Sequence, residues 1–188
     1  MSSILSKPIT IMGANASGKT ALAIELAKRT DGEIISADSK QIYKHLAAGT
    51  SKPEGRWKTI RGKEVYLVDG IPYHLVDFVD PLTAYDAGTF AADAKALMDS
   101  ISAEGKTPII VGGTGMYIQA LWNGLDTLPE ADQELRKHLA AFADAQGREA
   151  LHAELAALDP RAAAQIPPNN LQRVIRALEI TKLAGRPV

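Results

Sequence analysis

The chain has 188 residues, of which 46% are hydrophobic and 23% are charged, with no cysteine and a formal net charge of −1. This composition is typical of a globular domain, and it excludes disordered and collagen-like chains, disulfides, thiolate zinc sites and cysteine nucleophiles. No run approaches the roughly 18 apolar residues of a membrane span, and the N-terminus lacks the apolar core of a signal peptide. We therefore expect a soluble, cytoplasmic protein without a membrane partner.

Patterns of strand and helix alternate over the first two thirds of the chain. Alternation of this kind predicts an α/β fold, in which a parallel sheet is flanked by helices on both faces. Short β-prone apolar runs lie at residues 8–12, 33–37, 65–68, 74–79 and 107–111, and helical patterns lie at 20–29, 39–46, 86–104 and 114–122. The stretch 50–70 is polar and rich in Lys, Arg and Gly, which indicates an exposed excursion.

The composition changes after residue 122. From about 132 to 165 the chain is rich in Ala, Leu, Glu and Asp and has no β-prone run, so we predict two or three helices, broken at Gly147 and at Asp159-Pro160. Prolines lie at both ends of this stretch. We expect a small all-helical insertion at 123–168, between two parts of a core domain at 1–122 and 169–188.

Charge is distributed unevenly along the chain. Residues 1–121 carry 13 acidic and 13 basic side chains, residues 122–168 carry 8 and 4, and residues 169–188 carry 1 and 4. The last segment, a predicted helix at 169–184, is therefore a local basic element. A local basic patch is sufficient to contact nucleic-acid phosphates even when the total charge is close to zero.

The most specific motif follows the first predicted strand. It fits the phosphate-loop pattern G-x-x-x-x-G-K-[ST] at every fixed position, and a predicted helix follows it. Its backbone amides and the helix N-terminus suit an anion, Lys19 adds a positive charge, and Thr20 offers a hydroxyl to Mg²⁺. We predict a di- or triphosphate site formed by Gly13, Ala14, Asn15, Ala16, Ser17, Gly18, Lys19 and Thr20.

Two further segments follow predicted strands and are expected at the same edge of the sheet. Asp38 follows the second strand, where it suits a general base or a Mg²⁺ partner, or alternatively the N-cap of a helix at 39–46. The turn Gly112-Gly113-Thr114-Gly115 allows close approach of a ligand, or is an ordinary connection between a strand and a helix. Val65–Asp69 has the form of a Walker B strand, but Gly70 after it favours a hairpin turn.

Other polar residues carry weaker signals. Gln172, Arg173 and Arg176 have helical spacing, so the two guanidinium groups share a face that suits phosphate, a solvated face, or pairing with Glu179. The four histidines show neither metalloprotease spacing nor a Ser-His-Asp signature, and we interpret them as structural or surface residues.

Seven blocks, in order along nearly the whole chain, closely resemble the tRNA dimethylallyltransferases, also called tRNA isopentenyltransferases. The chain departs from the family pattern at Ala14-Asn15, where Pro-Thr is usual, and at Lys40, where an apolar residue is common. Members of the family usually continue beyond the position of Val188, so the resemblance implies a chain that lacks their C-terminal part. The blocks are GANASGKTALAIELAKR, EIISADSKQIYK, GTSKP, YHLVDFVDP, PIIVGGTGMYIQAL, LPEADQELR and NNLQRVIRALEITKLAGRPV.

The resemblance implies a phosphate-loop fold and the transfer of a dimethylallyl group from its diphosphate to N6 of the adenine beside the anticodon of tRNA. The loop would hold the diphosphate of the prenyl donor with Mg²⁺ on Thr20. The catalytic residues would be Asp38, which accepts a proton, Thr114 and Arg136. The family's partners would be the tRNA anticodon loop and dimethylallyl diphosphate, bound by a monomer. The tRNA contacts carried over are Asp38, Ser39, Lys40, Gln41, Gln172, Arg173, Val174, Ile175 and Arg176.

Three alternatives share parts of this pattern. A small-molecule kinase would use the same loop for ATP and close a lid over it, although the net charge of −4 at 122–168 does not suit a lid that clamps a triphosphate. An adenylate dimethylallyltransferase would transfer the same group to a free nucleotide. A catalytically inactive fragment would bind nucleic acid only.

Overall fold

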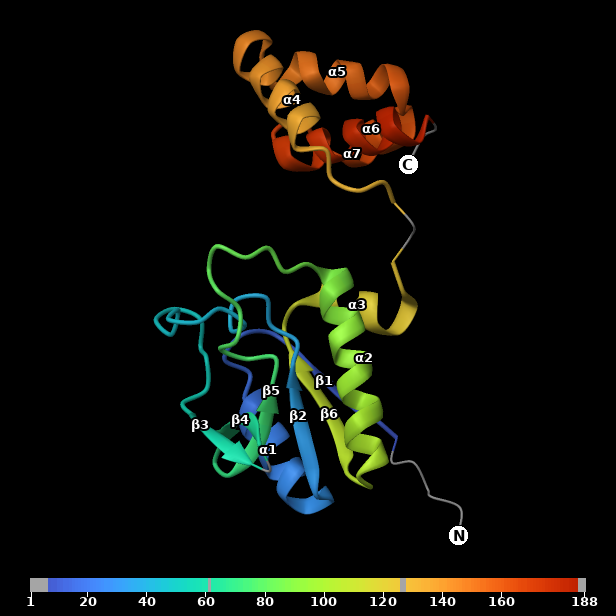
Figure 1. Cartoon of the computed structure of the whole chain (residues 1–188). Coiled ribbons are helices and arrows are strands. Elements are labelled where there is room, and N and C mark those ends of the chain that lie inside the picture. The colour runs from blue at the N-terminus through green and yellow to red at the C-terminus, as the bar shows by residue number, and fades with distance from the viewer. Residues whose placement is uncertain (1–6, 61, 126–127, 186–188) are drawn as a thin grey trace. The chain divides into compact units, whose positions relative to one another are not determined.

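The computed structural model describes residues 7–60, 62–125 and 128–185. The chain divides into two compact units, Met1–Leu125 and Asp126–Val188. Unit 1 contains a six-stranded sheet with helices, whereas unit 2 is helical (Figure 1). Among the described residues, no helix combines the length and the apolar character that crossing a membrane requires.

The sheet of unit 1 has the strand order β1-β6-β2-β5-β4-β3. The first four strands in this order pair in parallel, as the sequence predicts, whereas β4 pairs antiparallel with both β5 and β3. An antiparallel hairpin therefore extends a parallel sheet at one edge. The strands are β1 (Ile9–Met12), β2 (Gly32–Ser36), β3 (Arg56–Ile60), β4 (Lys63–Val68), β5 (Ile71–His74) and β6 (Thr107–Gly112).

Helices cover both faces of this sheet. Because successive side chains of a strand point to opposite faces, Ile34 of β2 packs on the side of α1 and Ile35 packs on the side of α2 and α3. Both isoleucines are fully buried, which makes β2 a central strand. The helices are α1 (Lys19–Thr30), α2 (Ala87–Ala103) and α3 (Gly115–Asn123).

The hairpin turn after β4 is confirmed. Val68 pairs with Ile71 across Asp69 and Gly70, and both turn residues have positive φ (51° and 81°). Two successive positive φ values are the geometry of a tight two-residue hairpin, in which the Asp-Gly pair is favoured. The strand at 65–68 is thus part of an edge hairpin. Its partner β3 lies in the stretch expected to be an exposed excursion, and all five of its residues are exposed.

The predicted helix at 39–46 is wrong, because this stretch forms turns. The carboxylate of Asp38 accepts hydrogen bonds from two following amides and so closes a turn. Tyr43 then pairs with Val79 in an isolated parallel bridge, and His45 has a φ of 63°, which a right-handed helix does not accommodate. Long-range pairing with the loop after β5 overrides the local helical pattern.

Unit 2 is built around one apolar cluster. Its helices end where the sequence predicts breaks: Gly147, with a φ of 95°, separates α4 from α5, and Asp159 caps α6 by accepting from the Ala162 amide at 2.9 Å. Proline occupies the first position of α6, where no amide hydrogen is needed. The helices are α4 (Gln133–Gln146), α5 (Arg148–Leu158), α6 (Pro160–Gln165) and α7 (Leu171–Ala184).

Helix α7 belongs to unit 2 rather than to the sheet domain to which residues 169–188 were assigned from the sequence. Val174 and Leu178, both fully buried, pack with Leu139 of α4 and Leu151 of α5. The apolar stripe of α7 is therefore covered by its neighbouring helices. Periodicity identifies such a stripe, but it does not identify the element that buries it.

The carboxyl ends of β2 and β6 approach unusually closely. The Ala37 amide donates to the Val111 carbonyl at 2.7 Å, and the Thr114 amide donates to the Ala37 carbonyl at 3.1 Å. A Cβ atom on Gly112 would lie 2.1 Å from the Ala37 carbonyl oxygen. Only glycine fits at this position, so the Gly-Gly-Thr turn is required for packing in addition to any role toward a ligand.

Replacing Gly112 with alanine should destabilise unit 1 by about 1–3 kcal/mol or more, because either the added methyl group or the Ala37 backbone must move. Urea denaturation followed by tryptophan fluorescence measures this effect. The matched control is Gly115→Ala, where nothing lies within 4 Å of the added atom, and we expect a change of about 1 kcal/mol or less. Equal stability of the two variants would contradict the close approach.

Candidate active site

The phosphate loop connects β1 to α1 and has the backbone geometry of an anion site. Gly18, the residue before α1, has a φ of 82°, and Ala16 has a φ of 60°. Since Gly18 has no side chain to cap the helix, the first amides of α1 are open toward the loop. The Lys19 ammonium donates to the Ala14 carbonyl at 2.5 Å, which places its charge over the loop. The predicted phosphate site is thus formed by local backbone geometry.

The turn after β6 lies against this loop. A Cβ atom on Gly113 would be 3.5 Å from the Asn15 side-chain oxygen and 3.6 Å from the Gly13 carbonyl, so Gly113 borders the phosphate loop. The Thr114 hydroxyl accepts a hydrogen bond from the Ser39 amide at 2.9 Å and lies 3.3 Å from the Ser39 hydroxyl. The loops that follow β1, β2 and β6 therefore come together at the carboxyl ends of the parallel strands, where a ligand-binding crevice is expected.

Asp38 lies in this crevice and is half-buried. Its Oδ1 accepts hydrogen bonds from the Lys40 amide at 2.9 Å and the Gln41 amide at 3.3 Å, so the capping role considered from the sequence exists, although it caps a turn and not a helix. Within the described residues, no hydrogen bond involves Oδ2. One oxygen thus orients the carboxylate while the other stays available to accept a proton.

Tyr73 lies near both Thr20 of the phosphate loop and Asp38, and it is not among the site residues predicted from the sequence. Burial raises the pKa of this phenol to about 12, a hydrogen bond with Thr20 lowers the pKa, and the negative charge of Asp38 raises it. Tyr73 is the third residue of β5, is 3% exposed, and pairs with Ile34 of β2. Its hydroxyl therefore lies near both the end of the phosphate loop and the carboxylate, and it stays protonated at neutral pH.

The residues after Asp38 divide into exposed and internal ones. Lys40 is exposed, whereas Gln41 is 7% exposed and its amide nitrogen donates to the carbonyls of Thr50 at 3.4 Å and Ser51 at 3.1 Å. The Gln41 side chain is thus occupied in anchoring the following loop. Of the predicted tRNA contacts in this stretch, Ser39 and Lys40 keep polar groups at or near the surface.

Unit 2 contains a second group of predicted site residues, centred on a fully buried carboxylate. Arg136 donates two hydrogen bonds to Glu179, both at 2.9 Å, and Arg176 donates to Glu179 at 2.5 Å and to the Pro129 carbonyl at 3.2 Å. The Asp132 amide donates to the same carboxylate at 2.7 Å. The alternative that Arg176 pairs with Glu179 is therefore confirmed. About a third of each arginine side chain remains exposed.

The other residues of the predicted tRNA segment lie along α7. Gln172 and Arg173 are exposed, Ile175 is half-buried, and Val174 is fully buried in the helical core. Within the described residues, Arg173 forms no ion pair. The side chains of Gln172 and Arg173 are thus open to a partner, whereas that of Val174 serves the packing of unit 2.

The histidines occupy structural or surface positions. His74 lies 2.6 Å from Glu33, which Lys106 also contacts at 2.6 Å. Burial raises the pKa of Glu33, but the hydrogen bonds with His74 and Lys106 lower it to about 2. His152 bonds to carbonyls at the end of α6, and His45 and His138 are exposed. Among the described residues, no group of three or more His, Asp or Glu side chains forms a metal cluster.

Fold and crevice together define a phosphate-loop α/β protein with a carboxylate and a hydroxyl facing the anion site. A family model described as IPP transferase matches residues 41–188, and one described as isopentenyl transferase matches residues 7–71. The chain belongs to the IPP transferase family, the tRNA dimethylallyltransferases, as the seven sequence blocks indicate.

Two relatives named tRNA dimethylallyltransferase illustrate the similarity. The protein from Elusimicrobium minutum is 52% identical over 178 residues, which cover 95% of this chain and 57% of the relative. The protein from Stenotrophomonas maltophilia strain K279a is 48% identical over 180 residues, or 96% and 54% of the two chains. The chain thus spans little more than half the length of these relatives.

Solved structures agree with the fold class predicted from the sequence. A tRNA isopentenylpyrophosphate transferase from Bacillus halodurans is 42% identical with a TM-score of 0.56, over 97% of this chain and 57% of that one. A eukaryotic dimethylallyltransferase acting on tRNA is 31% identical with a TM-score of 0.71, over 97% and 43%. The phosphate-loop α/β fold is therefore confirmed.

The pKa of Glu179 predicts how unit 2 responds to acid. Burial raises this pKa, but hydrogen bonds from Arg136, Arg176 and the Asp132 amide outweigh burial and hold it below 4.5. A lowered pKa in the folded state means that the unfolded chain binds more protons. The ionised carboxylate should therefore stabilise unit 2 fully above pH 4.5, and this contribution should be lost as the pH falls through the folded value.

We expect Glu179→Gln to lower the free energy of unfolding of unit 2 by about 1–3 kcal/mol at pH 7, with the difference from wild type shrinking below pH 4.5. Far-UV circular dichroism in urea measures it. Both tryptophans of the chain, Trp57 and Trp122, lie in unit 1, so fluorescence separates that unit's transition. The matched control is Glu134→Gln on an exposed side chain. A difference between Glu179→Gln and wild type that persists unchanged at pH 3 would contradict the role of the charge.

Proposed function

We propose that the chain carries the donor site and the catalytic carboxylate for transfer of a dimethylallyl group to tRNA. The donor is dimethylallyl diphosphate, the acceptor is N6 of the adenine beside the anticodon, and diphosphate is released. Family membership supports the reaction class. The observation that carries the proposal for this chain is that the phosphate loop, the turn with Thr114 and the loop that begins at Asp38 come together at the carboxyl end of the sheet.

The diphosphate suits the phosphate loop for electrostatic reasons. The open amides at the start of α1 and the Lys19 ammonium are fixed donors that interact more strongly with diphosphate as its charge increases on leaving. The protonated Tyr73 hydroxyl is a further neutral donor beside Thr20. During transfer, the bond from N6 to the first prenyl carbon forms while the bond from that carbon to the diphosphate oxygen breaks.

Asp38 is the group that takes the proton from the attacking amine. Its Oδ1 is fixed by the Lys40 and Gln41 amides, which leaves Oδ2 to accept the N6 proton. The Thr114 hydroxyl accepts from the Ser39 amide and donates its hydrogen to the Ser39 hydroxyl at 3.3 Å, a long contact that a reacting oxygen would replace. Both groups lie at the carboxyl end of the sheet, beside the loop that holds the leaving group.

The residues of the loop fit Mg²⁺. This ion binds few protein ligands and usually retains waters while it bridges substrate phosphates. The Thr20 hydroxyl at the start of α1 would hold it. When bound, Mg²⁺ would neutralise charge on the leaving diphosphate.

The acceptor side of the proposal involves both units. A base in an anticodon loop has to leave its stack to reach a catalytic pocket, and a single-stranded loop makes this step less costly than a duplex does. Ser39, Lys40, Gln172 and Arg173 offer exposed or half-buried polar groups to RNA. Arg136 keeps one guanidinium nitrogen outside its pairing with Glu179. We propose a cytoplasmic monomer.

Asp38→Asn removes the proposed base but preserves the turn, because the asparagine side-chain oxygen still accepts hydrogen bonds from the Lys40 and Gln41 amides. We expect kcat for prenyl transfer to tRNA to fall by about 10²–10⁴, with donor affinity within a factor of two or three of wild type. Single-turnover transfer of labelled dimethylallyl groups and equilibrium binding of the donor measure the two quantities. A parallel loss of donor affinity would indicate a role in binding instead.

Lys19→Ala should show the opposite pattern. It removes a charge-assisted contact, so donor affinity should fall by a factor that corresponds to about 1.5–3 kcal/mol. The control is Lys28→Ala on the same helix, whose ammonium lies 3.9 Å from Asp69 and away from the loop. Unchanged donor affinity in Lys19→Ala would contradict the assignment of the loop to the diphosphate.

Acceptor and donor identity are tested together. Labelled dimethylallyl diphosphate is incubated with the chain and either bulk tRNA or AMP, and terminally labelled ATP is tested for transfer in parallel. We expect label on tRNA alone. Label on AMP would favour an adenylate dimethylallyltransferase, and transfer from ATP without prenyl transfer would favour a kinase.

A further inference from the structure

The excursion between β2 and β5 concentrates positive charge. From residue 40 to residue 64 the sequence contains seven Lys and Arg residues and two Glu residues, a local net charge of +5 in a chain whose total is −1. The remainder of the chain is therefore acidic overall. Arg61, one of the seven, lies outside the described residues.

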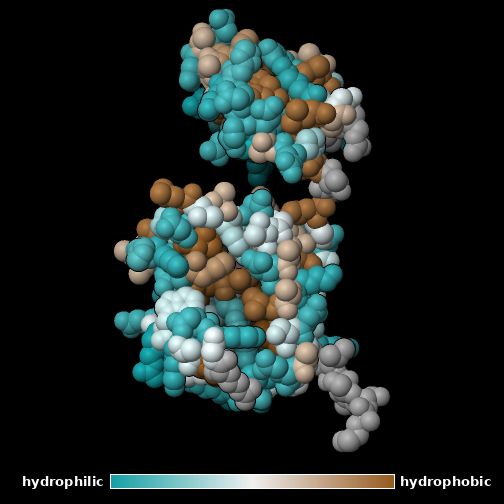
Figure 2. Space-filling view, viewed as in Figure 1, coloured by the Kyte–Doolittle hydropathy of each residue, from teal (hydrophilic) through white to brown (hydrophobic). Residues whose placement is uncertain are grey.

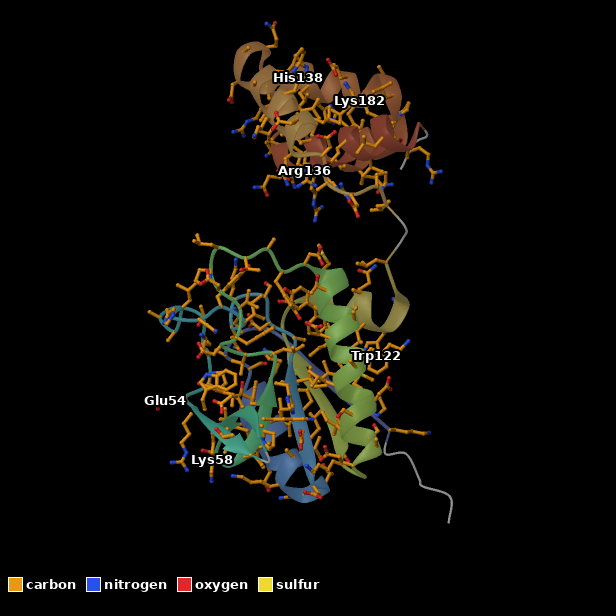
Figure 3. The ribbon with its side chains drawn as sticks, in the orientation of Figure 1. Glu54, Lys58, Trp122, Arg136, His138 and Lys182 are labelled. Atoms are coloured by element: carbon orange, nitrogen blue, oxygen red, sulfur yellow. The ribbon has the colours of Figure 1, made fainter. Side chains whose placement is uncertain are left out.

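Most of these cations are unpaired and face solvent. Within the described part of the chain, Lys40, Lys44, Arg56, Lys58 and Lys63 are exposed and form no ion pair. Lys58 extends outward from β3 (Figure 3), and the edge of unit 1 that carries this strand is mainly hydrophilic (Figure 2). Lys52 is the exception, since it is 5% exposed and paired with Asp77 at 2.6 Å.

An exposed indole accompanies the cations. Trp57 of β3 is 42% exposed, is packed edge-on against Tyr66 at 5.4 Å between ring centroids, and donates to Asp77 at 3.2 Å. These two contacts fix the orientation of the ring and leave part of it open. Because successive side chains of a strand point to opposite faces, the ring lies on the face of β3 opposite to Arg56 and Lys58, and it anchors the strand that carries these cations.

Hydrogen bonds connect this hairpin to the candidate active site. Trp57 bonds to Asp77, Asp77 pairs with Lys52, and Lys52 donates to the Tyr43 carbonyl at 2.5 Å. Gln41, three residues after the proposed base, holds the same loop through the carbonyls of residues 50 and 51. The hairpin is therefore anchored to the loop that begins at Asp38.

We propose that the cationic hairpin, defined as Arg56, Lys58 and Lys63, which the register of β3 and β4 places on one face, is a docking surface for the sugar-phosphate backbone of tRNA. The proposal extends the proposed function, because it assigns RNA contacts outside the catalytic crevice and outside residues 38–41 and 172–176. Backbone phosphates match the unpaired cations by charge.

A second explanation of the same residues is protection of a sheet edge. Edge strands often carry lysine to prevent pairing with another chain. That explanation requires only repulsion between copies, and it predicts that loss of the charges promotes association without a change in RNA binding. One experiment can therefore distinguish the two explanations.

The test compares wild type with the triple variant Arg56→Gln, Lys58→Gln, Lys63→Gln and with the control Lys95→Gln, an exposed cation on α2. Binding of end-labelled tRNA is followed by fluorescence anisotropy from 50 to 300 mM salt. We expect affinity to fall roughly tenfold or more in the triple variant, with the slope of log affinity against log salt reduced by about two to three. The control should shift the slope by less than about one.

If the triple variant keeps the tRNA affinity and the salt slope of wild type, the proposed docking surface is contradicted. If the triple variant associates with itself without losing tRNA affinity, the cations serve edge protection. Anionic phosphatidylserine vesicles that compete as well as unlabelled tRNA would also overturn it. Prenyl transfer is scored separately. If wild type transfers the prenyl group and the triple variant binds tRNA normally, only the docking surface is rejected. If the triple variant loses tRNA binding as predicted but wild type transfers no prenyl group, only the proposed function is rejected.

Discussion

The close approach of β2 and β6 at Ala37 and Gly112 is the constraint on which the crevice depends. Because no side chain separates the two strand ends, the turn after β6 lies within hydrogen-bond distance of the residues after β2. Thr114 consequently reaches Ser39, and Gly113 borders the phosphate loop. A wider separation of these strands would break the contacts of the turn after β6 with the phosphate loop and with Ser39.

Features that depend on local chemistry could be predicted from the sequence. The phosphate loop follows from glycines and a lysine at fixed spacing, and the turn at Asp69-Gly70 follows from two residues that tolerate positive φ. The helix breaks at Gly147 and Asp159-Pro160 follow from the same kind of signal. In each case a few adjacent residues determine the backbone, so no knowledge of distant contacts is needed.

Features that depend on distant partners could not be predicted in this way. The stretch after Asp38 has a helical pattern but pairs with Val79, and α7 has an apolar face whose partners are other helices of unit 2. Tyr73 begins the block YHLVDFVDP but has no chemical signature of its own, and its proximity to Thr20 and Asp38 follows only from the pairing of β5 with β2. β3 lacks apolar alternation because all of its residues face solvent.

The shared carboxylate of unit 2 has a consequence for the electric field of that unit. Glu179 neutralises one of the two positive charges of Arg136 and Arg176, so the cluster carries +1 rather than +2 and attracts a distant anion only weakly. The guanidinium planes are nevertheless held in a defined orientation. Under the proposed function, the cluster would select an anion by the direction of its remaining N–H groups, while long-range attraction would come from unpaired cations elsewhere in the chain.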